Sequence, residues 1–167
     1  MTTSGQSTHS PRKNLADLGI ELPEVAAPVA SYAPAVISGD TIYVSGQLPF
    51  KNGELPATGK VGAGVSAEDA ASYARQAALN ALAAINSLVD IDSVSIVKVT
   101  GFVASAPGFG GQPGVINGAS DLFGDVFGTA HARSAVGVSD LPLDAPVEVE
   151  VIARRNTGAE YRRNTSE

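Results

Sequence analysis

Hydrophobic residues recur at helical spacing between residues 66 and 88. Ser66-Ala-Glu-Asp69 opens this segment with a pattern like a capping box, in which the serine hydroxyl caps the first helical turn. The apolar positions that follow are Ala74, Ala77, Ala78, Ala81, Leu82, Ile85 and Leu88. Their spacing predicts a long amphipathic helix. Because most of these side chains are small, we expect the helix to pack closely on a sheet.

Strands are predicted where apolar and β-branched residues run together. Residues 94–104 form the clearest strand, with both faces largely covered. Residues 35–37 and 41–45 flank a Ser-Gly-Asp turn and predict a hairpin. A second helix is expected over residues 115–127, followed by strands over residues 133–138 and 147–152. The order β-β-α-β-α-β-β predicts an α+β fold with one sheet and two helices on one of its faces.

Less regular segments flank these elements. Asn14 and Gly19 have the residue types of an N-cap and a stop for a short helical turn. Residues 20–30 hold two prolines and should run extended, while residues 50–64 and 106–114 are Gly-rich loops. We therefore expect a flexible tail over residues 1–13, a single domain over residues 14–155 and a polar tail over residues 156–167.

The composition of the 167-residue chain excludes several classes of function. The net charge of −6 argues against a basic nucleic-acid interface. The chain has no cysteine and two histidines, which excludes a thiolate nucleophile and leaves too few ligands for a zinc site. No apolar run is long enough to span a bilayer, and the N-terminus lacks the apolar core of a signal peptide. We expect a soluble, cytoplasmic protein that binds neither membranes nor nucleic acids.

Arg133 is the only Lys or Arg between Lys98 and Arg154. A guanidinium binds carboxylates bidentately, so a small carboxylate is its natural ligand, and a salt bridge to Glu148 is the alternative. If the valines of residues 147–151 pack under the helices, the other face holds Ala135, Gly137, Glu148 and Glu150 without cover. Small residues mixed with carboxylates fit a subunit interface, with Arg133 at its edge. We therefore expect an oligomer.

Other candidate chemistry is less well supported by the pattern. His131 would be the base of a Ser-His-Asp triad, but the nucleophile motif GxSxG is absent. Glu148 and Glu150 could act as a glycosidase pair, although two glutamates two residues apart on a strand more often form a solvated or ion-paired face. Gly46 is either a plain turn or a point of close ligand approach. Asn117 either faces water and backbone or reaches a ligand.

Six segments in order within residues 29–155 carry a more specific signal. They are Tyr32, Ser45-Gly-Gln-Leu-Pro49, Asn117, Ala132-Arg-Ser-Ala-Val136, Leu141-Pro142 and Val147-Glu-Val-Glu150. Together they resemble the Rid family, the YjgF-type reactive intermediate deaminases. The resemblance implies a chorismate-mutase-like fold with a mixed or antiparallel sheet. It also implies a homotrimer whose sheets face a central barrel-like core, with ligand sites in the clefts between subunits.

The resemblance further implies roles for single residues. Arg133 would clamp the substrate carboxylate, and Glu148 would orient or activate the attacking water. The remaining substrate-binding positions would be Tyr32, Ser45, Gly46, Asn117 and Ala135. Ala135 stands where the family often has cysteine and Pro34 where glutamine is common, and His131 is a further sign of a divergent subgroup.

The activity that the resemblance implies is hydrolysis of enamine or imine intermediates, such as 2-aminoacrylate, to 2-keto acids and ammonia. This reaction needs a positioned water and a fixed substrate, and it requires no cofactor or metal. The alternatives are a non-catalytic binder or sensor of small carboxylates and a ribonuclease or translation inhibitor. The acidic net charge weighs against the last of these.

Overall fold

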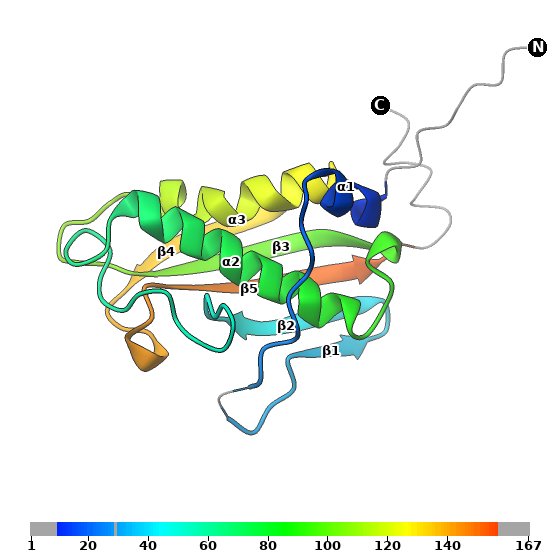
Figure 1. The fold of residues 1–167 in the computed structure, drawn as a ribbon, viewed down its shortest axis with the longest axis horizontal. Coiled ribbons are helices and arrows are strands. Elements are labelled where there is room, and N and C mark those ends of the chain that lie inside the picture. Colours follow the sequence, from blue (N-terminus) through cyan, green and yellow to red (C-terminus); the bar gives the residue numbers. More distant parts are fainter. Residues whose placement is uncertain (1–9, 29, 157–167) are drawn as a thin grey trace, which may run out of the picture.

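The computed structural model describes residues 10–28 and 30–156. Its elements follow the predicted order, preceded by the short helix that was expected near Asn14 (Figure 1). They are α1 (Pro11–Asp17), β1 (Ala35–Ser38), β2 (Thr41–Gln47), α2 (Ala67–Asn86), β3 (Val94–Ala104), α3 (Gln112–Phe127), β4 (Ala132–Val138) and β5 (Val147–Arg155). Short 3₁₀ helices, Ile91–Ser93 and Pro142–Asp144, precede β3 and β5. The α+β class is therefore confirmed.

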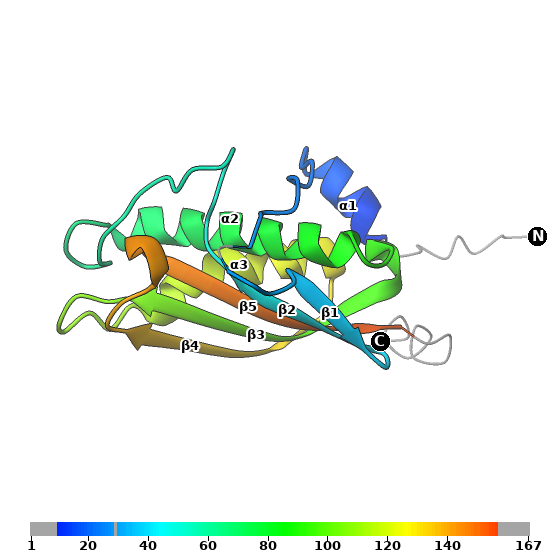
Figure 2. The same cartoon turned by 90° about the horizontal axis from the view of Figure 1, so that it is seen from below.

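The five strands form one mixed sheet in the order β1-β2-β5-β3-β4. The β3–β4 pair is parallel, and the other neighbouring pairs are antiparallel. A parallel pair needs a crossover connection, which α3 provides. Helices α2 and α3 lie side by side on one face of the sheet, with α1 against α3 (Figures 1 and 2). The other face of the sheet is not covered by any described part of the chain.

The core fills the space between α2, α3 and the sheet. Val147, Val149 and Val151 of β5 are fully buried there, beneath the alanine stripe of α2. The two helices approach so closely that a Cβ built on Gly118 of α3 would lie 1.9 Å from the carbonyl oxygen of Ala71 in α2. This close approach joins two helices, whereas the sequence predicted close packing of α2 on the sheet.

Two helices begin earlier than predicted. Helix α1 starts at Pro11, and its N-cap is Ser10, whose hydroxyl accepts a hydrogen bond from the Lys13 amide, so Asn14 lies inside the helix. Helix α3 starts at Gln112, because Pro113 fits the first turn, where its missing N–H has no helical partner to lose. Residues 11–13 of the expected tail are therefore helical, and residues 1–9 lie outside the described part.

The expected C-terminal tail is described only at its first residue. The Asn156 amide donates to the Ser93 carbonyl, and its side-chain oxygen accepts from the Ser95 hydroxyl at 2.7 Å. These bonds extend the β5 edge by one residue. Residues 157–167 lie outside the described part. Among the described helices, none combines the length and the apolar character that crossing a membrane would require.

The predicted faces of β4 were wrong. In the β3–β4 register, Arg133, Ala135 and Gly137 stand opposite Val99, Gly101 and Val103, which face the helices. Ala135 and Gly137 therefore lie on the covered face with Arg133, and not on the open face with Glu148 and Glu150. The physical reason is that β3 lies between β4 and β5, so strands that follow each other in sequence are not neighbours in the sheet.

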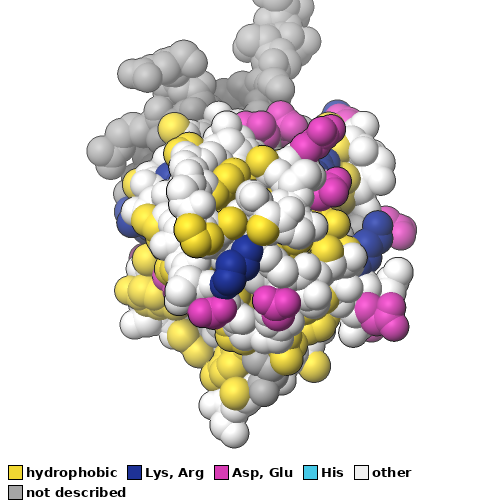
Figure 3. Space-filling model, turned by 90° about the vertical axis from the view of Figure 1, so that its left-hand side faces the viewer, with side chains coloured by type: hydrophobic (Ala, Val, Ile, Leu, Met, Phe, Trp, Pro, Cys, Tyr) yellow, Lys and Arg dark blue, Asp and Glu magenta, His cyan; other side chains and the backbone are white. Residues whose placement is uncertain are grey.

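The open face nevertheless carries exposed apolar side chains. Val36, Tyr43 and Val136 are 52%, 48% and 42% exposed, and Glu148 and Glu150 lie among them on β5. At the end of the molecule where the β2–α2 and β3–α3 loops meet, Lys and Arg side chains are few and separated by acidic and uncharged ones (Figure 3). That end shows no broad basic stripe.

Candidate functional site

Arg133 lies near the start of the edge strand β4, and its side chain reaches helix α3. One terminal nitrogen, Nη1, donates to Asn117 Oδ1 at 2.7 Å and to Ser120 Oγ at 3.3 Å. Asn117 and Ser120 are one helical turn apart, so both point toward the same strand. The Asn117 side chain therefore bonds Arg133, a contact that neither interpretation of Asn117 from the sequence included. Glu148, the alternative partner, makes no contact with Arg133 because it lies on the other face.

These two bonds determine which edge of the guanidinium is available. Nη1 has two hydrogens, and Asn117 and Ser120 engage one each. The Nε and Nη2 hydrogens make no hydrogen bond to the described residues and point in parallel along the other edge. That edge has the fork geometry that binds a carboxylate bidentately. Helix α3 thus holds the guanidinium in one orientation and leaves this edge without a partner among the described residues.

His131 joins this cluster two residues before Arg133. Its Nε2 lies 3.0 Å from Ser120 Oγ, and its ring stands edge-on to the buried ring of Phe123, at 6.0 Å between centroids. Burial, followed by the nearby Arg133 cation, lowers the pKa of His131 below its ordinary value. The ring is therefore neutral at physiological pH.

Glu148 lies in a second cluster, around the irregular end of β2. The β2–β5 register shifts between Val44 and Gln47, which places Gly46 against the Glu148 side chain. A Cβ built on Gly46 would lie 1.7 Å from Glu148 Oε1. Gly46 is therefore required for the position of this carboxyl group. The expected close approach of a ligand at this glycine stays a prediction.

The environment of Glu148 favours its protonated form. Burial, with the like charge of Glu150 as a smaller cause, raises the pKa of Glu148 above its ordinary value of 4.5. A carboxyl group with a raised pKa is a better proton acceptor once it has ionised. Glu148 and Glu150 are thus distinguished by their environments, since Glu150 is exposed.

Tyr32 and Ser45 belong to the Glu148 side of the molecule. The Ser45 hydroxyl donates to the Ala33 carbonyl at 2.7 Å, which holds the segment after Tyr32 against β2. Tyr32, Pro34 and Gly46 line a small hollow of about 30 Å³. Within one copy of the chain, Ser45 therefore positions the segment that lines this hollow.

The predicted site residues therefore form two groups. Arg133, Asn117 and Ala135 lie on the helix-covered side at the β4 edge. Gly46 and Glu148 lie on the other side of the sheet, across β3 and β5, together with Tyr32 and Ser45. No single copy of the chain brings Arg133 and Glu148 to one ligand.

The sequence did not predict Ser120 as a site residue, and it did not predict the contacts of His131 with Ser120 and Phe123. Ser120 was detectable in principle, because it lies three residues after Asn117 on the same helical face. Its link to Arg133 depends on the β3–β4 register, which the sequence pattern did not reveal. No group of three or more His, Cys, Asp or Glu side chains suited to a metal is found among the described residues.

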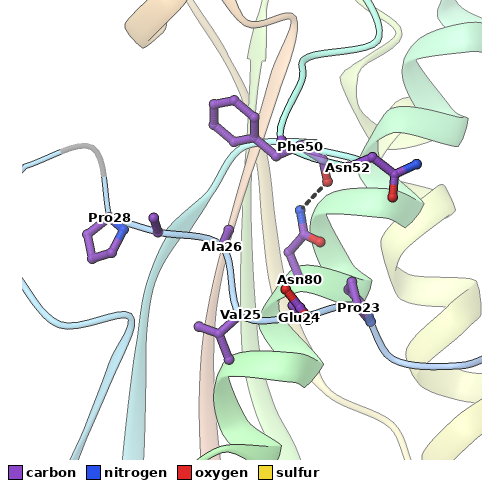
Figure 4. A pocket seen from close by; sticks show the side chains of 10 residues that line it. Pro23, Glu24, Val25, Ala26, Pro28, Phe50, Asn52 and Asn80 are labelled. Carbon is purple, nitrogen blue, oxygen red and sulfur yellow. Dashed lines mark hydrogen bonds between the residues drawn. The ribbon is translucent and has the colours of Figure 1, made fainter.

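A larger hollow of about 610 Å³ lies between residues 23–28 and the loop after β2 (Figure 4). Asn80 of α2 reaches into this region, but its amide nitrogen already donates to the carbonyls of Leu48 and Phe50. Among the described residues that line this hollow, Glu24 is the charged one and none is Lys, Arg or His. It therefore lacks a group that would bind a carboxylate, and Asn80 serves to hold the loop.

The mixed five-stranded sheet, the two covering helices and the arginine on the edge strand define a YjgF-like α+β domain. The family described as Endoribonuclease L-PSP matches residues 23–155. The chain belongs to this family, the YjgF/Rid family, as its motifs predicted.

Similar proteins carry several names. The protein TCP17 of Trypanosoma cruzi is 43% identical over 148 residues, which cover 86% of this chain and 92% of the relative. The 2-iminobutanoate/2-iminopropanoate deaminase of Escherichia coli K12 is 35% identical over 132 residues, covering 77% and 91%.

Solved structures with this fold include two of similar length. Atu1372 from Agrobacterium tumefaciens, a protein of unknown function, has a TM-score of 0.81 at 41% identity, covering 89% of this chain and 94% of that one. The YjgF gene product of E. coli has a TM-score of 0.59 at 30% identity, covering 80% and 99%. These likenesses support the fold.

Proposed function

We propose that the protein hydrolyses small 2-imino acids, formed from enamines such as 2-aminoacrylate, to 2-oxo acids and ammonia. The observation that carries this proposal is the Arg133 guanidinium, held by α3 with one bidentate edge free. A 2-imino acid presents a carboxylate next to the electrophilic carbon, so binding the carboxylate also positions the reacting bond. The deaminase names of several relatives support the same reaction class.

In the proposed reaction, water attacks the imine carbon. Glu148 accepts a proton from the water, and the C–O bond forms as the C=N double bond becomes a single bond. Glu148 passes this proton to the imine nitrogen, which gives a carbinolamine. Glu148 then takes the proton of the new hydroxyl group and passes it to the nitrogen, so that the C–N bond breaks and ammonia leaves as the C=O bond forms. Glu148 suits this role because its raised pKa makes the carboxylate a stronger base than a solvated one.

The site is proposed to lie between subunits of a homotrimer. Arg133 and Glu148 lie on opposite faces of one sheet, so one subunit would supply the arginine and its neighbour the glutamate. The exposed apolar residues of the open face, which include Val36, Tyr43 and Val136, would be buried by this association. Tyr32 would wall the cleft from the Glu148 side.

A coupled assay tests the proposal. A threonine or serine dehydratase generates the enamine in place, and the rate of ammonia release is measured with and without the protein. We expect wild-type protein to accelerate the release and Arg133→Gln protein to lose most of this effect. Equal rates with wild type and Arg133→Gln would overturn the proposal. Binding of 2-oxobutanoate without any acceleration would indicate a carboxylate binder in place of an enzyme.

A further inference from the structure

The hydrogen bonds around Arg133 continue to a residue that the proposed reaction does not use. Ser120 Oγ accepts from Arg133 Nη1 at 3.3 Å and lies 3.0 Å from His131 Nε2. His131, Ser120 and Arg133 thus form a chain with the hydroxyl in the middle. We propose that His131 is a positioning residue: it fixes the Ser120 hydroxyl, which in turn fixes the guanidinium for binding the substrate carboxylate.

The donor and acceptor roles support this order. Arg133 has donors and no acceptor, so Ser120 must accept from it. The hydroxyl hydrogen is then free to point at His131 Nε2, provided that the neutral ring carries its proton on Nδ1. In that arrangement each group has one defined role. Without His131, the hydroxyl could rotate or turn back to a helix carbonyl, as serines in helices do.

His131 is itself held in a fixed orientation. Its ring packs edge-on against Phe123, which is fully buried in the core. Its Nδ1 is buried and has no hydrogen-bond partner among the described residues. The packing of the ring on Phe123 therefore holds Nε2 at the Ser120 hydroxyl.

Few charges face the His131 ring. Arg133 is the charged neighbour on its own strand. Helix α3 presents Ser120 and Phe123 toward the ring, while its carboxyl groups, Asp121 and Asp125, are exposed. Lys98 of β3 stands beside Ala132 and therefore points to the opposite face from His131 and Arg133. Burial is thus the larger cause of the lowered His131 pKa, and Arg133 is the nearby cation that adds to it.

The inference rests on the proposed function only for the identity of the ligand. Binding of 2-oxobutanoate, the product of one candidate reaction, is measured by calorimetry for four variants. His131→Phe keeps the packing on Phe123 and removes the hydrogen bond, and Ser120→Ala removes the link. Each should weaken binding about five-fold, the factor for one net hydrogen bond. His131→Gln, whose amide reaches the place of Nε2, should bind as wild type does.

The double variant His131→Phe/Ser120→Ala separates positioning from a general structural effect. Because His131 acts through Ser120, the double variant should bind no more weakly than Ser120→Ala alone. In the coupled assay the change should fall on KM and leave kcat within two-fold, since a carboxylate contact is made in both ground and transition states. Ser72→Ala, which removes a hydroxyl bonded within α2, is the matched control and should change nothing.

An NMR titration tests the positioning role of His131 even if the proposed function is wrong. The proposed function is wrong if wild-type protein neither binds 2-oxobutanoate nor releases ammonia. The His131 ring is titrated by NMR in wild type and Arg133→Gln, with His131→Gln used for assignment. Removing the cation should raise the pKa of His131. An unchanged pKa, or unaltered 2-oxobutanoate binding in both His131→Phe and Ser120→Ala, would overturn the inference.

Discussion

Arg133 and Glu148 point to opposite faces of the same sheet. Arg133 stands opposite the buried Val99 in β3, whereas Glu148 stands opposite Phe102, three residues further along that strand. Residues an odd number apart on a strand face opposite sides, so the sheet itself separates the two side chains. A ligand that touches both therefore requires two copies of the chain.

Mixed oligomers should show this division directly. Arg133→Gln and Glu148→Gln are each expected to retain at most a few per cent of wild-type activity alone, at substrate concentrations below the wild-type KM. When equal amounts are co-expressed, a site has an intact arginine in half of the cases and an intact glutamate in half. About one quarter of the wild-type activity should return if each site draws on two subunits of a closed ring. The measurement is ammonia release per site in the whole unselected mixture, purified through one tag that both variants carry. A mixture as inactive as its components would show that both residues act within one chain or not at all.

Arg133 should determine substrate affinity. Arg133→Gln removes the charge and the fork, and we expect KM to rise roughly 100-fold, as for the loss of a charge-assisted bidentate pair. Arg133→Lys keeps the charge without the fork and should raise KM roughly 10-fold. Steady-state kinetics over a range of dehydratase-generated substrate give these values. A KM of Arg133→Lys equal to that of wild type would show that the charge of Arg133 binds the carboxylate and that the bidentate contact is not needed.

The fold was largely accessible from the sequence, and the division of the site was not. The alanine stripe of α2 predicted a helix, and the turn at Gly39 predicted a hairpin, because the periods of helices and strands are local properties of the sequence. Helix α1 was placed late because Asn14 and Ser10 are both good capping residues, and Ser10 is followed by Pro11. The face of Arg133 depends on β3 inserting between β4 and β5, which is a long-range pairing that no local pattern records.

Glu148 should affect the pH dependence of both activity and stability. Its pKa is raised, so the carboxylate base forms at higher pH than for a solvated glutamate, and kcat/KM should rise with pH through that raised value. Glu148→Gln should lower kcat roughly 10²–10⁴-fold. Glu150→Gln removes the smaller cause of the shift and should move the acid limb of the profile to lower pH. An acid limb at the same pH as in wild type would mean that Glu150 does not raise the pKa of Glu148.

Because its pKa is raised in the folded protein, the ionised form of Glu148 destabilises the folded state. The folded protein holds this proton more tightly than the unfolded chain, so stability falls as pH rises from the ordinary pKa through the raised one. Glu148→Gln should therefore raise the melting temperature at pH 7 to 8, and the difference from wild type should vanish below about pH 4. Thermal unfolding followed by circular dichroism at several pH values measures this difference.

Gly46 should matter for activity more than for folding. A methyl group on Gly46 would collide with Glu148 Oε1, which is the movable end of a side chain and not backbone. Gly46→Ala should therefore fold but displace the carboxyl group, and kcat should fall toward that of Glu148→Gln. Gly64→Ala is the control, since a Cβ there meets nothing within 4 Å. A fully active Gly46→Ala protein would show that the observed position of Glu148 is not needed for catalysis.

Two glycines of α3 should respond to alanine in opposite directions. A Cβ on Gly118 would lie 1.9 Å from the Ala71 carbonyl oxygen, which belongs to the backbone of α2 and cannot move without separating the helices. Gly118→Ala should destabilise the fold by about 3 kcal/mol, the upper range for overpacking. A Cβ on Gly124 meets nothing within 4 Å, so Gly124→Ala should add about 0.5–1 kcal/mol through helix propensity. Urea unfolding of both variants measures the difference, and a Gly118→Ala protein as stable as Gly124→Ala would show that the two helices do not pack as closely as described.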